Sequence, residues 1–187
     1  MRRCFLILAL PILVSALLIS GCSRRGGDSG DDSESTVWGL QITAIESMTG
    51  STYIESSVHA DDLGTDDSAI VYVINRYPDY YEGNEIDPTY NVIITRYLVQ
   101  LELPGYSPFS FERSMYVSIA ASTSDDETTL TMVAVPSTLK SQLATIVDAE
   151  GGILEGIFRI RIEGKFGNGE EAYTTGEARL RITSQDS

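Results

Sequence analysis

The side chains with the clearest chemical potential are two clusters of acids. They comprise Asp61, Asp62, Asp66 and Asp67 in the first, and Asp125, Asp126 and Glu127 in the second. Calcium takes about six to eight oxygen ligands, and loops at one end of a domain can supply them together. Neither cluster has the spacing of an EF-hand loop. The sequence therefore favours solvent-exposed acidic turns, with a calcium site as the alternative.

A tyrosine-rich segment is the second candidate site. Residues 77–90 read YPDYYEGNEIDPTY and lie between two predicted strands. The candidate binding residues within it are Asp79, Tyr80, Tyr81 and Glu82. Loops at the ends of a domain commonly carry recognition, and tyrosine offers a large contact area with a polar tip. These four side chains are the candidates for binding a protein or a glycan, and Tyr77 and Tyr90 are expected to cover the ends of the flanking strands. The alternative is an exposed loop with no binding role.

Catalytic patterns are scarce in the sequence. His59 is the only histidine, and no serine-elbow motif accompanies it. Zinc sites need several cysteine or histidine ligands. Carboxylates are plentiful, but no pattern pairs them across a groove as glycosidase chemistry requires. We therefore expect a protein without enzymatic activity or cofactor, and a carboxylate-based hydrolase is the least favoured alternative.

The charge balance excludes one class of partner. The 187 residues include 13 Lys and Arg against 27 Asp and Glu, which gives a net charge of −14. A nucleic-acid backbone is bound by clustered basic side chains. We expect no nucleic-acid partner.

The N-terminal segment has the features of an export signal. Residues 1–3 are a short basic stretch, residues 4–20 are mostly apolar, and LISGC follows at residues 18–22. This pattern resembles the lipobox of bacterial lipoproteins. The resemblance implies cleavage after residue 21, attachment of a diacylglycerol to the Cys22 thiol, fatty acylation such as palmitate on the new amine, and anchorage to the bacterial envelope. Ser23 resembles the sorting signal for the outer membrane, facing either the periplasm or the cell surface; the outer leaflet of the inner membrane is the alternative.

Composition divides the rest of the chain. Residues 22–36 contain the lipidated cysteine and then only small, polar or charged side chains, which indicates a flexible linker. From residue 37 onward the apolar residues alternate with a period of two, as in half-buried strands. We therefore assign residues 1–21 to the signal peptide, 22–36 to the linker and 37–187 to one β domain.

The strongest strand predictions are 90–103, 158–166 and 178–182, with weaker ones at 38–47, 52–60, 69–76, 113–121 and 128–135. In the first of these, the alternation predicts one face with Ile93, Thr95, Tyr97, Val99, Leu101 and Leu103, and the other with Arg96, Gln100 and Glu102. The sequence Gly167-Asn168-Gly169 predicts a hairpin between the last two strands. After Pro136, a helix of about three turns is predicted with Ser137 or Thr138 as its cap.

These elements predict an all-β fold, an antiparallel two-sheet sandwich with one short helix. The final hairpin resembles the last two strands of immunoglobulin-like or fibronectin-like modules, and a small closed barrel is the alternative. The expected function is that of a lipid-anchored binding or assembly module with a protein or glycan partner. A structural accessory subunit of an envelope complex is the second hypothesis.

Overall fold

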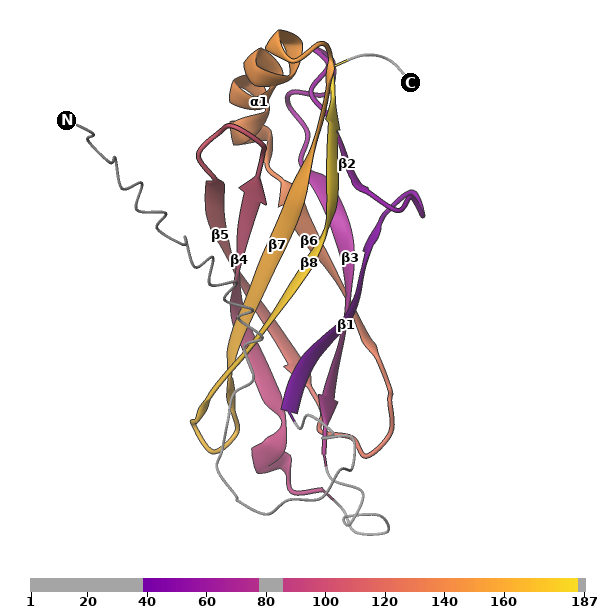
Figure 1. Cartoon of the computed structure of the whole chain (residues 1–187). Coiled ribbons are helices and arrows are strands. Elements are labelled where there is room, and N and C mark those ends of the chain that lie inside the picture. Colours follow the sequence, from indigo (N-terminus) through magenta and orange to yellow (C-terminus); the bar gives the residue numbers. More distant parts are fainter. Residues whose placement is uncertain (1–38, 78–85, 185–187) are drawn as a thin grey trace, which may run out of the picture.

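Alternating apolar and polar residues build the strands of the computed structural model, which describes residues 39–77 and 86–184 (Figure 1). The strands are β1 (Gly39–Ser47), β2 (Ile54–Ser57), β3 (Asp67–Arg76), β4 (Val92–Glu102), β5 (Phe109–Ile119), β6 (Thr128–Val135), β7 (Ile153–Phe166) and β8 (Glu171–Thr183). A 3-10 turn, η2 (Pro88–Tyr90), precedes β4, and the helix α1 (Ser137–Ala149) connects β6 to β7.

The strands form two sheets. One has the order β1-β3-β6 and the other has the order β2-β8-β7-β4-β5. The predicted all-β, two-sheet sandwich is therefore confirmed. All pairs are antiparallel except β2 with β8, which is parallel. When β1 and β2 are taken as two halves of a first strand, this order matches the A-B-E and G-F-C-C′ sheets of immunoglobulin domains.

The core lies between the sheets and is built from the inward side chains of every long strand. Among those that are almost fully buried are Val71, Ile94, Leu101, Met132, Phe158, Ile160, Ile162 and Leu180. Burying one such side chain contributes roughly 1.5–3 kcal/mol. The inward faces predicted for 158–166 and 178–182 are confirmed, because Phe158, Ile162 and Ile182 are all buried.

The face predicted for 90–103 is wrong at its start. The register of β4 shifts between Ile94 and Arg96, so Thr95 and Arg96 both lie on the exposed side. Such a bulge reverses the alternation. Consequently Val92 and Ile94 are buried in place of Ile93 and Thr95, whereas Tyr97 keeps its predicted inward position.

The five-stranded sheet is curled, and two glycines of β7 permit the curl. A Cβ atom on Gly156 would lie 2.3 Å from the carbonyl oxygen of Glu102, and one on Gly164 would lie 2.3 Å from that of Ile93. Both glycines lie on the inward side of β7, where the neighbouring β4 backbone bends over the strand. Only a residue without a side chain fits such a close approach.

Several predicted boundaries differ from the observed ones. The strand predicted at 52–60 is confined to β2, and His59 lies after it instead of within a strand. In contrast, β5 starts four residues earlier than predicted, and β7 and β8 extend far beyond the predicted segments. The residues added to β8 are mostly polar or small, so their hydrophobic alternation is weak. Those added to β5 and β7 include the apolar residues Phe109, Phe111, Leu154 and Ile157, so a lack of hydrophobicity does not account for these two extensions.

The predicted helix is confirmed, and α1 covers one end of the sandwich, opposite the β7–β8 turn (Figure 1). Leu143 and Val147 are buried against the core. The predicted cap is wrong: Pro136 occupies the N-cap position, and its side chain cannot accept a hydrogen bond. In the described ranges no helix has the length and apolar character needed to cross a membrane.

Candidate functional site: the charged face of the five-stranded sheet

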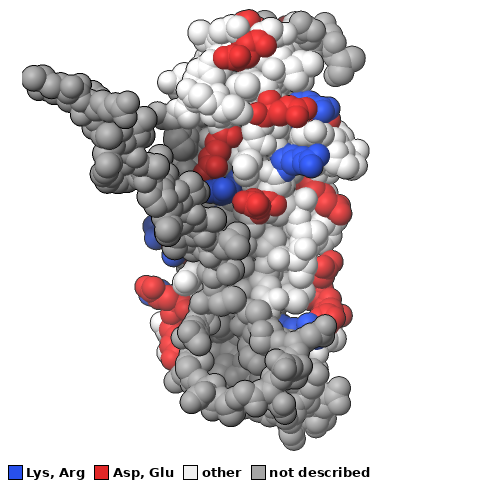
Figure 2. All heavy atoms as spheres, in the orientation of Figure 1, with Lys and Arg blue, Asp and Glu red and all other residues white. Residues whose placement is uncertain are grey.

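The outer surface of the five-stranded sheet gathers charges of both signs, and we call it the charged face. Its basic side chains are Arg96, Arg159, Arg161, Lys165, Arg179 and Arg181. Its acidic side chains are Glu55, Glu102, Glu112, Glu155, Glu163, Glu171 and Glu177. Residues directly opposite on neighbouring strands share a face, which places these side chains in cross-strand rows. Figure 2 shows acidic and basic groups interspersed over the visible surface of the domain.

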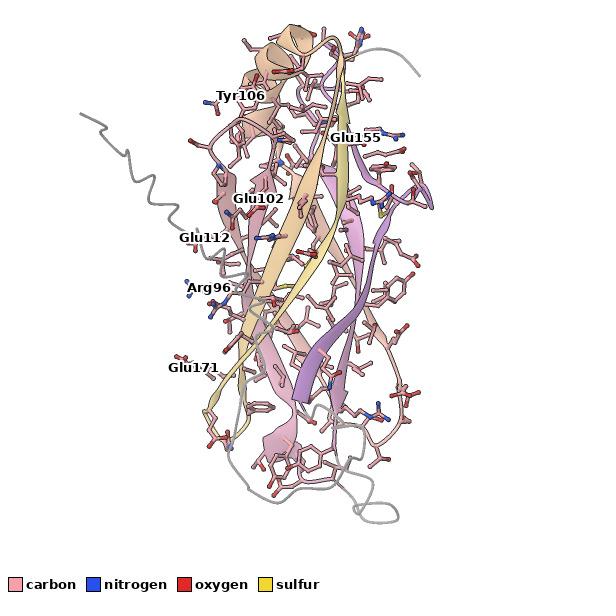
Figure 3. The ribbon with its side chains drawn as sticks, viewed as in Figure 1. Arg96, Glu102, Tyr106, Glu112, Glu155 and Glu171 are labelled. Carbon is pink, nitrogen blue, oxygen red and sulfur yellow. The ribbon has the colours of Figure 1, made fainter. Side chains whose placement is uncertain are left out.

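Glu163 of β7 is the centre of the largest cluster. Its Oε2 accepts from Arg96 Nε at 2.6 Å, and its Oε1 lies 2.7 Å from Arg161 Nε. Arg96 also approaches Glu112 of β5, with Nη1 3.6 Å from Oε2. The hydrogen bond with Glu163 raises the pKa of Arg96 above its ordinary value. Figure 3 shows Arg96 and Glu112 projecting from adjacent strands.

Beside this cluster the surface is hollowed to a volume of about 350 Å³. The hollow is lined by side chains of β4, β7 and β8, among them Thr95, Arg96, Arg161, Lys165, Glu171 and Tyr173. The guanidinium of Arg161 lies over the Tyr173 ring, 4.5 Å from its centroid. The bulge of β4 creates this arrangement, since it turns two consecutive side chains, Thr95 and Arg96, toward solvent.

A second cluster lies closer to α1. Two nitrogens of Arg181 donate to the same oxygen, Glu155 Oε1: Nη2 at 2.8 Å and Nε at 3.1 Å. Its guanidinium lies 4.0 Å from the centroid of the Tyr53 ring. The hydrogen bond with Glu155 raises the pKa of Arg181. Between the clusters, Arg159 contacts Glu102 at 2.9 Å and Glu177 at 3.3 Å.

These contacts fix long, otherwise mobile side chains in rows whose spacing the sheet sets. Arginine that is already ordered loses less conformational freedom when a partner binds. Exposed apolar side chains interrupt the charges, since Ile153 is 54% exposed and Tyr173 40%. The face can therefore offer guanidinium donors, carboxylate acceptors and apolar contact to one partner surface.

The acidic residues of 61–67 have structural contacts. Lys140 of α1 is completely buried, and its Nζ lies 2.9 Å from Asp67 Oδ2 and donates to the Asp62 carbonyl at 3.1 Å. The hydroxyl of Ser56 donates to the same Asp67 oxygen at 2.6 Å. The expectation that this segment is only a solvated turn is therefore wrong for Asp67, which anchors the helix.

Asp66 supplies the cap that the helix lacks. Its Oδ1 accepts from the backbone N–H of Ser137 at 2.7 Å, and its Oδ2 lies 3.4 Å from Arg113. The hydrogen bond from Ser137 lowers the pKa of Asp66, and the Arg113 charge adds to the effect. An acceptor provided by a distant segment thus satisfies a first-turn donor of α1.

The two acidic clusters do not meet. Asp66 precedes the first residue of β3, whereas Asp125 lies 3.1 Å from Arg76 at the last residue of that strand. At about 3.3 Å per residue, the two ends are roughly 30 Å apart. Within 39–77 and 86–184, no three His, Cys, Asp or Glu side chains come together as metal ligands. The arrangement required by the calcium alternative, with both clusters at one end, does not occur.

The tyrosine segment is described only at its ends. The rings of Tyr77 and Tyr90 stack at a tilt with centroids 4.3 Å apart. Tyr77 directly follows the last residue of β3, as predicted, whereas Tyr90 ends the 3-10 turn η2, two residues before β4. The candidate binding residues Asp79, Tyr80, Tyr81 and Glu82 lie outside the described residues, as does Cys22. Sequence reasoning missed the charged face, although the alternation of Arg159, Arg161 and Glu163 with buried residues was its signal. No protein-family model matches the sequence, and no curated protein matches it significantly.

Proposed function

We propose that this chain is an exported lipoprotein, anchored through a lipid on Cys22, which acts as a non-enzymatic binding or assembly module in the bacterial envelope. The outer membrane is the proposed location. The partner we propose is a protein, and the charged face is its binding surface. The supporting observation is that six basic side chains of an acidic chain share one face of a single sheet.

Mixed charges favour a protein over a uniformly anionic partner. Acidic side chains accompany every basic row of the face, so a polyanion would meet carboxylates wherever it met guanidinium groups. A protein surface can present the complementary pattern, which gives specificity and register. A structural accessory role is the second candidate, and the free edge of β5 favours it.

The binding surface can be tested by photo-crosslinking in cells. A photoreactive residue at Thr175, an exposed position of β8 on the charged face, should capture one partner protein. The same residue at Thr131, an exposed position of β6 on the other sheet, is the matched control. Equal capture at both positions, or none at Thr175, would contradict the proposal.

A charge-reversal variant provides a second test of the binding surface. Lys165→Glu with Arg179→Glu should abolish capture at Thr175 and lower the thermal midpoint only slightly, because both side chains are exposed and neither forms a salt bridge with another described residue. The small loss expected comes from the acid that Lys165→Glu places opposite Glu171 and from the lost contact of Arg179 with the Tyr53 ring. The anchor is tested separately, since Cys22→Ser should abolish fatty-acid labelling. Labelling that survives this change would show that the lipid is attached at another residue and would contradict the proposed anchor.

A further inference from the structure

The four edges of the two sheets differ in how their free backbone is protected. The edge strands are β1 and β6 in the smaller sheet, and β2 and β5 in the larger one. Exposed edges pair readily with other strands, and proteins usually protect them. The protection of each edge can be read from its contacts.

Contacts or short length limit three of these edges to different degrees. The N–H of Ile42 in β1 donates to the Thr174 hydroxyl of β8 at 3.3 Å. The N–H of Val133 in β6 donates to the Tyr97 hydroxyl at 3.0 Å, across the sandwich interior. The strand β2 has only four residues. Each of these hydrogen bonds fills one N–H position of its edge strand, and a strand of four residues offers few positions for pairing.

The fourth edge, β5, is long and open. Among the described residues, the backbone of residues 109–118 is hydrogen-bonded to no element other than β4. The strand has eleven residues and contains no proline, glycine or lysine. Pairing with β4 shifts register opposite Met115 and Tyr116, but exposed and half-buried side chains continue to alternate through this point.

The side chains of β5 suit a second copy of the same strand. The exposed row consists of Ser110, Glu112, Ser114, Tyr116 and Ser118. On the other side, Phe109, Phe111, Met115 and Val117 are only partly buried against the core. The strand carries one acid and one base, so it is a neutral strip in a protein of strongly negative charge.

Full-length pairing also selects one register. An antiparallel pair that uses all eleven residues places Phe109 opposite Ile119 and Ser114 opposite its own copy. A register that places Glu112 or Arg113 opposite the same residue of the second copy would bring like charges together, which is destabilising. In the Ser114 register, Glu112 faces Tyr116 of the second copy, and Tyr116 is 79% exposed in the single chain.

We propose that two copies of this chain pair through the free edge of β5, antiparallel and centred on Ser114, to form one continuous ten-stranded sheet. Such a contact is self-complementary about a two-fold axis. It goes beyond the proposed function and uses none of the side chains that the charge-reversal variant changes. Failure of one proposal therefore leaves the other in place.

Cysteine crosslinking of the full-length protein in its membrane tests the register. Directly opposite Cα atoms in an antiparallel pair lie about 4.5–5.5 Å apart, within the range a disulfide spans. Ser114→Cys should therefore give a disulfide-linked dimer in most molecules after mild oxidation. The unchanged protein is the reference, because Cys4 and Cys22 are already present.

Two neighbouring positions provide the controls. Ser110→Cys alone and Ser118→Cys alone should not link, because each lies about 26 Å from its own copy in this register. The double variant with both cysteines should link, since each then faces the other. Equal linking at all three single positions would indicate random collision and overturn the proposal, as would a Ser114→Cys protein that stays monomeric.

A lysine variant tests the edge without a covalent bond. Ser118→Lys should abolish dimers of the lipoprotein in detergent, as measured by sedimentation, because charge on an edge prevents pairing. Thr129→Lys places the same charge on the edge strand β6 and should leave the dimer intact. Co-purification of two differently tagged copies identifies the partner. A product formed with another protein, or with the chain's own N-terminal segment, would overturn the assignment to a second copy.

Discussion

Two ion pairs of equal length occupy opposite environments in this domain. Lys140 Nζ lies 2.9 Å from an Asp67 oxygen beneath α1, and Arg159 Nη1 lies 2.9 Å from a Glu102 oxygen on the charged face. The Lys140 side chain is 0% exposed, whereas that of Arg159 is 47% exposed. Burial, not distance, therefore decides what each pair contributes to stability.

The physical reason is solvent screening. Water screens the exposed pair, and ordering its two side chains offsets much of the attraction. The buried pair has lost the hydration of the ammonium group, so each partner depends on the other. The buried pair connects the helix to β3, while the exposed pairs position side chains for binding. The same chemistry thus serves the fold at one site and recognition at the other.

The largest effect is expected at Lys140. Lys140→Ala should lower the free energy of unfolding by about 3 kcal/mol, because it leaves Asp67 without its cation and removes buried aliphatic contact. For a domain of this size, that loss corresponds to a fall in the thermal midpoint of roughly 6–12 °C. Calorimetry of the isolated lipoprotein measures it.

Lys140→Met separates charge from packing, because methionine keeps most of the side-chain volume. If Lys140→Met is as stable as the parent protein, the ion pair adds nothing beyond its volume, and the comparison between the two pairs fails. Asp67→Asn completes a double-mutant cycle, in which we expect a coupling energy above about 1.5 kcal/mol.

A smaller effect is expected at the helix start. Asp66→Ala removes the acceptor for the Ser137 N–H and should lower stability by about 1 kcal/mol, the usual cost of losing a helix cap. Denaturant unfolding measures it. Asp61→Ala is the matched control, because its carboxylate is 94% exposed and makes no capping contact. A loss of equal size in both variants would mean that the region responds to charge and not to capping.

These contacts show what the sequence could and could not predict. The sandwich, the hairpin and the helix follow from residue patterns that repeat locally, such as the alternation from Phe158 to Phe166. The partner of Lys140 cannot be predicted from such a local pattern. The ion pair joins positions 73 residues apart and depends on how α1 packs against β3. The bulge at Thr95 also escapes prediction, since nothing in the local alternation indicates an extra residue there. The charged face depends on the order of strands in the sheet, which period-two patterns do not specify.

The third prediction concerns the stability of the domain at low pH. The folded-state pKa of Asp66 is depressed, so its contribution to stability is fully present above the unfolded pKa of about 3.9. That contribution is lost as the pH falls through the lower, folded pKa. We therefore expect part of the acid destabilisation below about pH 4 to disappear in Asp66→Asn, as measured by urea unfolding at several pH values. An unchanged slope would show that other carboxylates account for the whole effect.

The smallest effect is expected on the charged face. Arg159→Gln removes the contacts with Glu102 and Glu177, yet stability should change by less than about 0.5 kcal/mol, because both partners remain hydrated when the guanidinium is removed. The coupling energy between Arg159→Gln and Glu102→Gln should likewise stay below about 0.5 kcal/mol and approach zero in high salt, where exposed charges are screened. The Lys140–Asp67 coupling should keep most of its value under the same conditions, since salt does not reach a buried ammonium group. Measuring both cycles at low and high salt therefore tests the comparison directly. A coupling on the charged face that equals the buried one would mean that these rows of arginine and glutamate hold the sheet together, and their role in binding a partner would lose its physical basis.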